Sequence, residues 1–203
     1  MHGDSSTSHK KSNKKTQRWC SELLEGKNVN LRIMEKEDLP LFQEWLNNPK
    51  FMGEYAPPTQ SSRTELEKVN EANPFELKFF IIEKKDGSKI GYVFHLNMLT
   101  YFIMGKLLEI GYAVLPSERG RGYCTEAAQL MVDYLFLSKD IARIQATTHT
   151  KNVISQKVLE KVGFKREGTL RKPALIRGEW TDMFMFSILR EEWKEPKILT
   201  KTA

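Results

Sequence analysis

The sequence contains only two cysteines, Cys20 and Cys124, and neither stands at the spacing of a metal-ligand pair. A disulfide framework and a cysteine-based zinc site are therefore not indicated. Histidine is also scarce, with four in the whole chain. Two of them lie near the start, and the other two stand alone in strand-like segments. A structural histidine is the more common role at such positions. We expect no bound metal.

Long apolar runs are absent as well. No stretch approaches the roughly 18 apolar residues that suggest a membrane span, and the first residues are too polar for a secretory signal. We therefore expect a cytoplasmic protein without a membrane contact. The 203 residues, of which 40% are hydrophobic, suffice to bury the core of a single domain.

Net positive charge is scarce outside the N-terminal segment. The net charge is +6, but residues 1–18 carry +4 of it, so the folded part is almost neutral. A domain that binds nucleic acid through its folded surface more often carries its charge there. We expect a disordered basic extension over 1–22, a domain over 23–195 and a tail over 196–203. The extension is either a solubilising arm or a contact for nucleic acid or a ribosome.

The apolar pattern predicts strands and helices interspersed along the chain, without an internal repeat. The clearest element is a hairpin over 77–99, in which two apolar segments flank Asp86 and Gly87. A helix can begin after Ser61 or Ser62 as its cap. Further strands are predicted at 29–34, 107–116, 141–149 and 183–189, and further helices at 35–48, after Gly122 and at 152–164. This order predicts one α/β domain.

The stretch "SERGRGYCTEAAQLM", residues 117–131, places two glycines and two arginines before a helix. Glycine permits left-handed backbone, and the unpaired N–H groups of a helix start suit a phosphate. The stretch contains no phosphate-binding G-x-x-x-x-G-K-[ST] motif, and Thr125 stands where a dinucleotide fingerprint needs glycine. On its own it favours an anion site over a basic loop only slightly.

A second motif, "NVISQKVLEKVGF" over 152–164, predicts a short helix capped by Asn152 and ended by Gly163. Together with "RGRGYCTEA" about thirty residues earlier, it resembles the GNAT superfamily of N-acetyltransferases. The resemblance is closest to the ribosomal-protein N-terminal acetyltransferases of the RimJ and RimL type. It covers about residues 23–193, because "LEGKNVNLRIMEKEDLPLFQEW" and "GEWTDMFMFSILREEW" also fit.

The resemblance implies a single-domain α/β fold with flanking helices, in which a mixed central sheet splays at its fourth strand and holds acetyl-CoA in the gap. The pantetheine arm would pair with that strand and contact Asn152, which as a plain helix cap serves equally well. The implied pyrophosphate turn comprises Arg119, Gly120, Arg121, Gly122, Cys124 and Thr125, and the implied strand residues are Tyr112, Ala113, Val114 and Leu115. Cys124 replaces a usually smaller residue, and a reactive cysteine remains an alternative there.

Acetyl transfer to an amine needs a neutral nucleophile, a stabilised oxyanion and a leaving thiolate, without a covalent enzyme intermediate. Many relatives carry a proton-donating tyrosine seven residues after the helix-capping asparagine, but Leu159 stands here. The RimJ and RimL branch implies Ser155 instead, placed near the cofactor sulfur. A capping or surface serine is the alternative reading of Ser155.

The general base is less determined by the sequence. Glu109 precedes the turn, and Glu167 and Asp182 are alternatives. Some relatives place a carboxylate within "KPALIRG", where this chain has Ala174 and Leu175.

The resemblance also implies that the link between the first two helices forms one wall of the acceptor site. The candidates there are Trp45, Phe51 and Tyr55 as aromatic surface and Glu54, together with Glu109, as attraction for a cation. The acceptor can be a peptide N-terminus, a polyamine, an aminoglycoside or a small amine, and the fold does not select among them. A homodimer is a further open alternative.

Three functional hypotheses follow. An acetyl-CoA-dependent N-acetyltransferase explains both motifs. An idle acyl-CoA sensor fits the leucine at position 159. A nucleic-acid-binding module explains only the basic extension and predicts a steep salt dependence of binding.

Overall fold

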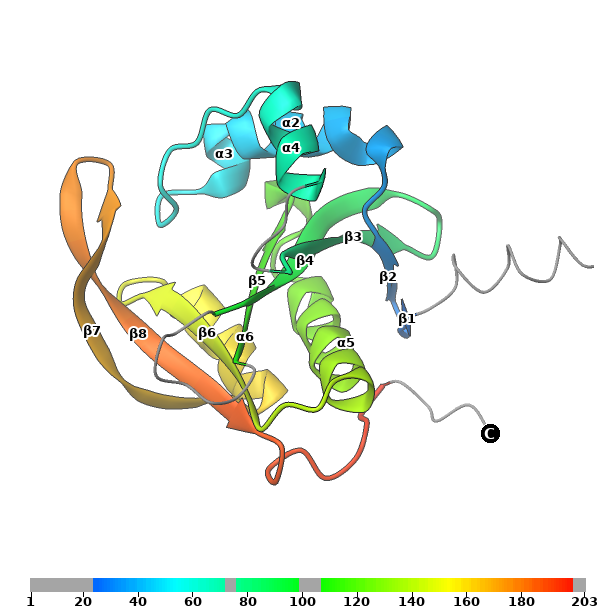
Figure 1. Ribbon diagram of the computed structural model, residues 1–203, viewed down its shortest axis with the longest axis vertical. Coiled ribbons are helices and arrows are strands. Elements are labelled where there is room, and N and C mark those ends of the chain that lie inside the picture. The colour runs from blue at the N-terminus through cyan, green and yellow to red at the C-terminus, as the bar shows by residue number, and fades with distance from the viewer. Residues whose placement is uncertain (1–23, 72–75, 99–106, 199–203) are drawn as a thin grey trace, which may run out of the picture.

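The computed structural model describes residues 24–71, 76–98 and 107–198, which form a mixed sheet of eight strands with helices on both faces (Figure 1). The order across the sheet is β1-β2-β3-β4-β5-β6-β8-β7. The strands are β1 Leu24–Glu25, β2 Val29–Ile33, β3 Lys78–Lys84, β4 Lys89–Asn97, β5 Leu108–Val114, β6 Arg143–His149, β7 Lys165–Ile176 and β8 Glu179–Leu189. The α-helices are α2 Leu39–Asn47, α3 Pro49–Met52, α4 Arg63–Glu71, α5 Tyr123–Ser138 and α6 Val153–Val162.

Two apolar clusters assign the helices to faces of the sheet. The larger contains buried residues of α5 and α6 together with Leu108, Ile110 and Ile144 of the central strands. The smaller joins Phe42 of α2 and other aromatic residues to β3 and β4, and Ala113 of β5 packs against it. Because strand residues alternate between faces, each central strand presents one set of side chains to α5 and α6 and the other to α2 and α3.

The sheet opens between β5 and β6. Over the described residues, these two neighbours run parallel and pair only at Leu108 with Ile144 and at Glu109 with Gln145. Beyond that point, no described residue pairs with residues 110–114 of β5 on the β6 side, although they pair with β4 on the other. The predicted splay is therefore confirmed. The expected fourth strand is β5 in this numbering, because the two-residue strand β1 precedes the four longer strands β2 to β5.

The capping predictions are confirmed where the structure describes them. Ser62 Oγ accepts a hydrogen bond from the N–H of Glu65 at 3.2 Å, so Ser62 caps α4. Asn152 Oδ1 accepts from the N–H of Ser155 at 3.1 Å, and Gly163 ends α6 with a left-handed φ of 114°. The predicted hairpin is formed by β3 and β4 around the turn that contains Gly87.

Some elements were not predicted from the sequence, among them the two-residue strand β1 and the short helix α3. Pro49 occupies the first turn of α3 behind the cap Asn48, a position that proline tolerates because its missing N–H has no intrahelical partner. The long strand β7 was not predicted, because nearly all of its side chains are exposed and show no apolar alternation. The expected basic extension and Cys20 lie outside the described residues, and the C-terminal tail is described only to residue 198.

Candidate active site

The predicted anion-binding turn leads directly from β5 into α5. Gly120 and Gly122 have left-handed φ angles of 77° and 85°, which a residue with a side chain rarely adopts. A Cβ at either position would meet open space. Among the residues that the structure describes, no acceptor contacts the N–H groups of Gly120, Arg121 and Gly122. These donors stand at the start of a 16-residue helix, an arrangement that suits a phosphate.

Both arginines of the turn have partners within the protein. Nη2 of Arg119 donates to the carbonyl of Phe51 at 2.7 Å, so this side chain joins the turn to α3. Nη1 of Arg121 lies 3.5 Å from a carboxylate oxygen of Glu118 and is more than half exposed. The attraction of the turn for an anion therefore comes mainly from backbone N–H groups.

Cys124 lies in the first turn of α5. Burial raises the pKa of its thiol to about 12, so the thiol keeps its proton near neutral pH. Because the thiolate is the reactive form, this environment argues against the alternative of a reactive cysteine.

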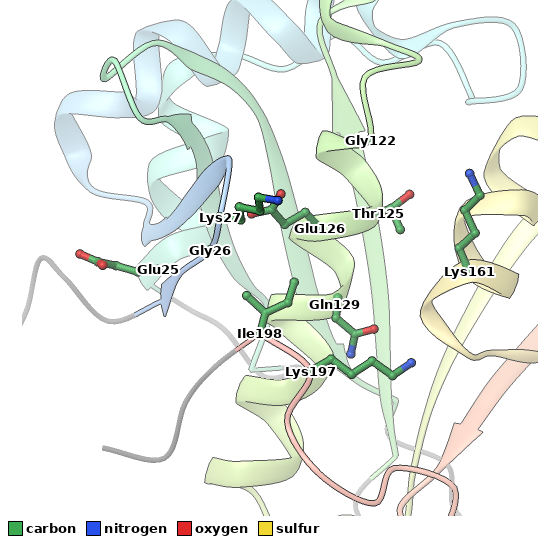
Figure 2. Close-up of a pocket in the computed structure, with 10 residues that line it drawn as sticks. All are labelled: Glu25, Gly26, Lys27, Gly122, Thr125, Glu126, Gln129, Lys161, Lys197 and Ile198. Carbon is green, nitrogen blue, oxygen red and sulfur yellow. The ribbon is translucent and has the colours of Figure 1, made fainter. Parts of the chain in front are cut away.

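A groove of about 740 Å³ runs along α5 from this turn (Figure 2). Thr125 and Gln129 line it from α5, while Lys161 of α6 and Lys197 of the C-terminal segment stand on its α6 side. Nζ of Lys197 donates to the carbonyl of Val162 at 3.1 Å, which leaves two of its three donors for other partners. Sequence analysis assigned neither lysine to the site, although Lys161 stands within the motif over 152–164.

Ser155 lies at the open part of the sheet. Its Oγ is 3.2 Å from Oη of Tyr112 on β5, beyond the last pair between β5 and β6. Leu159, one turn further along α6, is 1% exposed and packs in the core, as an apolar residue should. Tyr112 was expected to contribute only its backbone, and its side chain was missed because a strand pattern does not say which helix its residues will meet.

Glu109 marks the closed end of the gap. Its carboxylate accepts hydrogen bonds from Nε2 of Gln145 at 2.9 Å and Oγ1 of Thr147 at 2.8 Å, both on β6. Leu108 and Ile110 pack toward α5, so Glu109 faces the opposite side of the sheet. Tyr112 packs against the α5 cluster, so Glu109 and the Tyr112–Ser155 contact lie on opposite faces of the gap.

The two alternative bases have structural partners. Glu167 accepts from both terminal nitrogens of Arg143, at 3.1 and 3.0 Å, and from Ser187. The hydrogen bonds from Arg143 and then Ser187 hold the pKa of the Glu167 carboxyl below its usual value, which weakens it as a base. Asp182 accepts from the N–H of Lys172 at 2.9 Å, where the irregular β7 has a left-handed φ. Asp182 thus fixes the shape of the β7–β8 hairpin.

The expected acceptor residues separate into two groups. Trp45 and Phe51 are 3% and 1% exposed and stack in the core with ring centroids 5.3 Å apart. This corrects the expectation that they offer surface to an acceptor. Glu54 and Tyr55 follow α3 on the surface, and the Tyr55 ring lies 5.0 Å from the ring of His149.

The β7–β8 hairpin closes the other side of this region. Its turn, Arg177 and Gly178, has two left-handed residues, as a tight two-residue hairpin requires. Nη2 of Arg177 donates to the carbonyl of Gly53 at 3.2 Å, so the tip of the hairpin meets the end of α3 (Figure 1). Over the described ranges, no group of three potential metal ligands is present and no helix is long and apolar enough to cross a membrane.

Sequence comparisons identify one family. The profile of the acetyltransferase (GNAT) domain matches residues 28–165. The uncharacterized N-acetyltransferase p20 of Bacillus licheniformis is 31% identical over 180 residues, which cover 85% of this chain and 98% of p20. The uncharacterized N-acetyltransferase YnaD of Bacillus subtilis (strain 168) is 36% identical over 117 residues, which cover 57% of this chain and 66% of YnaD.

A solved structure agrees with this assignment. RimJ of Mycobacterium smegmatis, in complex with CoA-disulfide, is similar with a TM-score of 0.71 and 27% identity, covering 83% of this chain and 85% of the RimJ chain. The predicted GNAT fold and its similarity to the RimJ branch are thereby confirmed. The chain belongs to the GNAT family and is an acetyl-CoA-dependent N-acetyltransferase.

Proposed function

We propose that the chain transfers the acetyl group of acetyl-CoA to a primary amine, a protein N-terminus or a small molecule, by direct attack in a ternary complex. The observation that carries this proposal is the gap between β5 and β6, which has Ser155 on one face of the sheet and Glu109 on the other. A donor entering from the α5 and α6 side and an amine entering from the α2 and α3 side would meet in this gap.

The cofactor follows a path from the turn into the gap. The free N–H groups of residues 120–122 hold the pyrophosphate, and the unpaired edge of β5 at residues 112–114, with Leu115 after it, hydrogen-bonds the pantetheine arm as an added strand would. Asn152 caps α6 beside this path. The groove with Lys161 and Lys197 receives the phosphorylated nucleotide end. The complex of the similar RimJ protein with CoA-disulfide supports a CoA ligand for this fold.

The proton steps are divided between the two faces. Glu109 takes a proton from the attacking amine, directly or through water, on the face that bears α2 and α3. Ser155 assists the departing thiolate on the face that bears α5 and α6.

The acceptor binds beside the loop that follows α3. Tyr55, His149 and the tip of the β7–β8 hairpin surround this region, and Glu54 supplies a negative charge for a cationic amine. The buried Trp45 and Phe51 support the loop from below rather than contact the amine.

Thiol release from acetyl-CoA, measured with the full chain over a panel of amines, tests the proposal. The panel includes spermidine, an aminoglycoside and short peptides with a free N-terminus. We expect release that depends on at least one amine, with the acetylated product identified by mass spectrometry. Calorimetric binding of CoA without turnover of any amine would instead establish the idle sensor, and the absence of CoA binding would remove the assignment of the cofactor path.

A further inference from the structure

The contact between Tyr112 and Ser155 brings two hydroxyl groups together at the open edge of β5. Oη of Tyr112 lies 3.2 Å from Oγ of Ser155 and 3.3 Å from the carbonyl oxygen of the same residue. The two residues are separated by 43 positions in the sequence, so the fold itself creates the pair. It crosses from β5 to the first turn of α6, where the sheet no longer joins β5 to β6.

The proton count allows two arrangements of this pair. In the first, Tyr112 donates to the carbonyl of Ser155 and accepts the serine proton, which leaves no proton for a third group. In the second, Tyr112 donates to Oγ, and the serine proton is free to point into the gap. Ser155 lies within α6, where its carbonyl already accepts an intrahelical hydrogen bond. The second arrangement gives each acceptor one donor.

We propose that Tyr112 is a positioning residue for acetyl transfer: its hydroxyl donates to Ser155 Oγ and thereby directs the single serine proton toward the sulfur of the acetyl donor. This proposal rests on the proposed function, in which Ser155 assists departure of the thiolate. It adds a side chain to the mechanism at a position that had only a backbone role.

The bonds and protons balance as follows. The amine nitrogen forms a bond to the acetyl carbon, and the carbon–sulfur bond breaks with its electron pair going to sulfur. Ser155 passes its proton to sulfur while its oxygen still accepts the hydrogen bond from Tyr112. Glu109 takes the proton that the amine loses and releases it to water, and water returns a proton to Ser155 after the thiol has left, so the net change is one proton moved from nitrogen to sulfur.

Tyr112 keeps its own proton throughout. Its side chain is partly buried and packs against the α5 cluster, and burial raises the pKa of the phenol well above its usual value. The group is therefore a constant hydrogen-bond donor over the working pH range rather than an acid that titrates.

The Tyr112–Ser155 pair lies apart from the turn that is proposed to hold the pyrophosphate. The backbone of that turn faces the phosphate end of the cofactor, while Tyr112 and Ser155 lie where the thioester would reach the gap. Loss of the Tyr112 hydroxyl should thus affect the rate of transfer and leave CoA affinity unchanged.

The test compares Tyr112→Phe, Ser155→Ala and the double variant with Tyr134→Phe, which removes a hydroxyl from a half-buried tyrosine on α5 whose ring packs against Phe80. We expect Tyr112→Phe to lower kcat about tenfold at unchanged CoA affinity, and Tyr134→Phe to retain full activity. The double variant should be no slower than Ser155→Ala, because both changes act on one proton. Thermal unfolding of each variant verifies that it is folded.

A second donor isolates the leaving-group step. With p-nitrophenyl acetate, whose leaving group departs as a stable anion, the deficit of Tyr112→Phe should disappear, whereas a merely structural defect would persist. Unchanged kcat in Tyr112→Phe, or multiplicative losses in the double variant, would overturn the role of Tyr112 while leaving Ser155 in place. Full activity of Ser155→Ala would overturn the proposed proton donor and Tyr112 with it, and calorimetry with CoA checks the cofactor assignment independently of both.

Discussion

The carboxylate of Asp133, buried in the middle of α5, accepts a hydrogen bond from the indole nitrogen of Trp193 at 2.8 Å. The same carboxylate accepts from Nε2 of Gln129 and from the backbone N–H groups of Lys197 and Ile198. One side chain of α5 therefore fastens the segment that follows β8. This segment carries Lys197 to the groove beside the pyrophosphate turn.

Replacing Asp133 should destabilise the protein strongly. Asp133→Ala leaves the indole and two backbone donors without their acceptor, so we expect the free energy of unfolding to fall by about 3 kcal/mol. Urea unfolding followed by circular dichroism measures it. Asp140→Ala, at an exposed position just after the end of α5, is the matched control and should change it by less than about 0.5 kcal/mol. Equal effects of the two variants would contradict the anchoring role.

Gly122→Val tests the pyrophosphate turn. The left-handed φ of 85° makes any side chain strained there, and a Cβ would project into the space assigned to the phosphate. We expect CoA affinity to fall at least tenfold, about 1.4 kcal/mol, by calorimetry. Gly87→Val carries the same strain at φ 83° in the β3–β4 turn and should keep its affinity. A folded Gly122→Val protein with normal affinity would refute the turn as the phosphate site.

The groove in Figure 2 predicts a preference for the phosphorylated form of the nucleotide. The double change of Lys161 and Lys197 to Gln should weaken CoA binding about tenfold. Binding of dephospho-CoA should be weaker in the unchanged protein and respond little to the same substitutions. Lys157→Gln, on an exposed face of α6 outside the groove, is the control. Equal losses for both ligands would show that the two lysines contact another part of the cofactor.

The local signals in the sequence were strong enough to place several helix caps and turns. Ser62, Asn152 and Gly163 cap helices in the way that their residue types predict, and the two glycines of the turn adopt left-handed backbone. These features depend on neighbours within a few residues. The strand β7 escaped prediction because it is held by pairing with β8 and not by an apolar pattern of its own.

Side-chain partners were harder to foresee than elements. Trp45 and Phe51 were expected at the acceptor surface, yet they stack with one another beneath it, because an aromatic residue in a loop-flanking helix can face either way. The contact of Tyr112 with Ser155 and that of Asp133 with the C-terminal segment join residues far apart in the chain. Such pairs follow from the packing of the helices on the sheet, which periodicity alone does not specify.

His95 predicts a dependence of stability on pH. It is 1% exposed, and neither ring nitrogen has a hydrogen-bond partner among the residues that the structure describes. Burial, followed by the charges of Lys139 and Lys78, lowers its pKa from 6.5 to about 4. Between these two values the unfolded chain binds the proton and the folded protein does not. Stability contributed by neutral His95 is therefore complete above pH 6.5 and decreases as the pH falls toward 4, by at most about 3 kcal/mol.

Urea unfolding at pH 7.5 and at pH 5 measures this effect. His95→Phe preserves a ring beside Phe80, whose centroid lies 6.2 Å from that of His95, and removes the titration. We expect the variant to lose less stability than the unchanged protein between the two pH values. Identical losses would show that other groups account for the acid sensitivity.

Glu109 provides the sharpest test of the base. Its carboxylate is held by Gln145 and Thr147 at the closed end of the gap, on the face that the amine is proposed to approach. Glu109→Gln keeps the size of the side chain but cannot take a proton, so kcat should fall roughly 100-fold or more near neutral pH. The acidic limb of the pH–rate profile should shift, and raising the pH should partly restore activity, because more of the amine is then neutral.

Glu167→Gln, in the carboxylate paired with Arg143, should leave that limb in place. If Glu109→Gln retains the original acidic limb while Glu167→Gln or Asp182→Asn loses it, the base lies on the β7–β8 hairpin, and if none of the three changes the limb, an ordered water takes the proton.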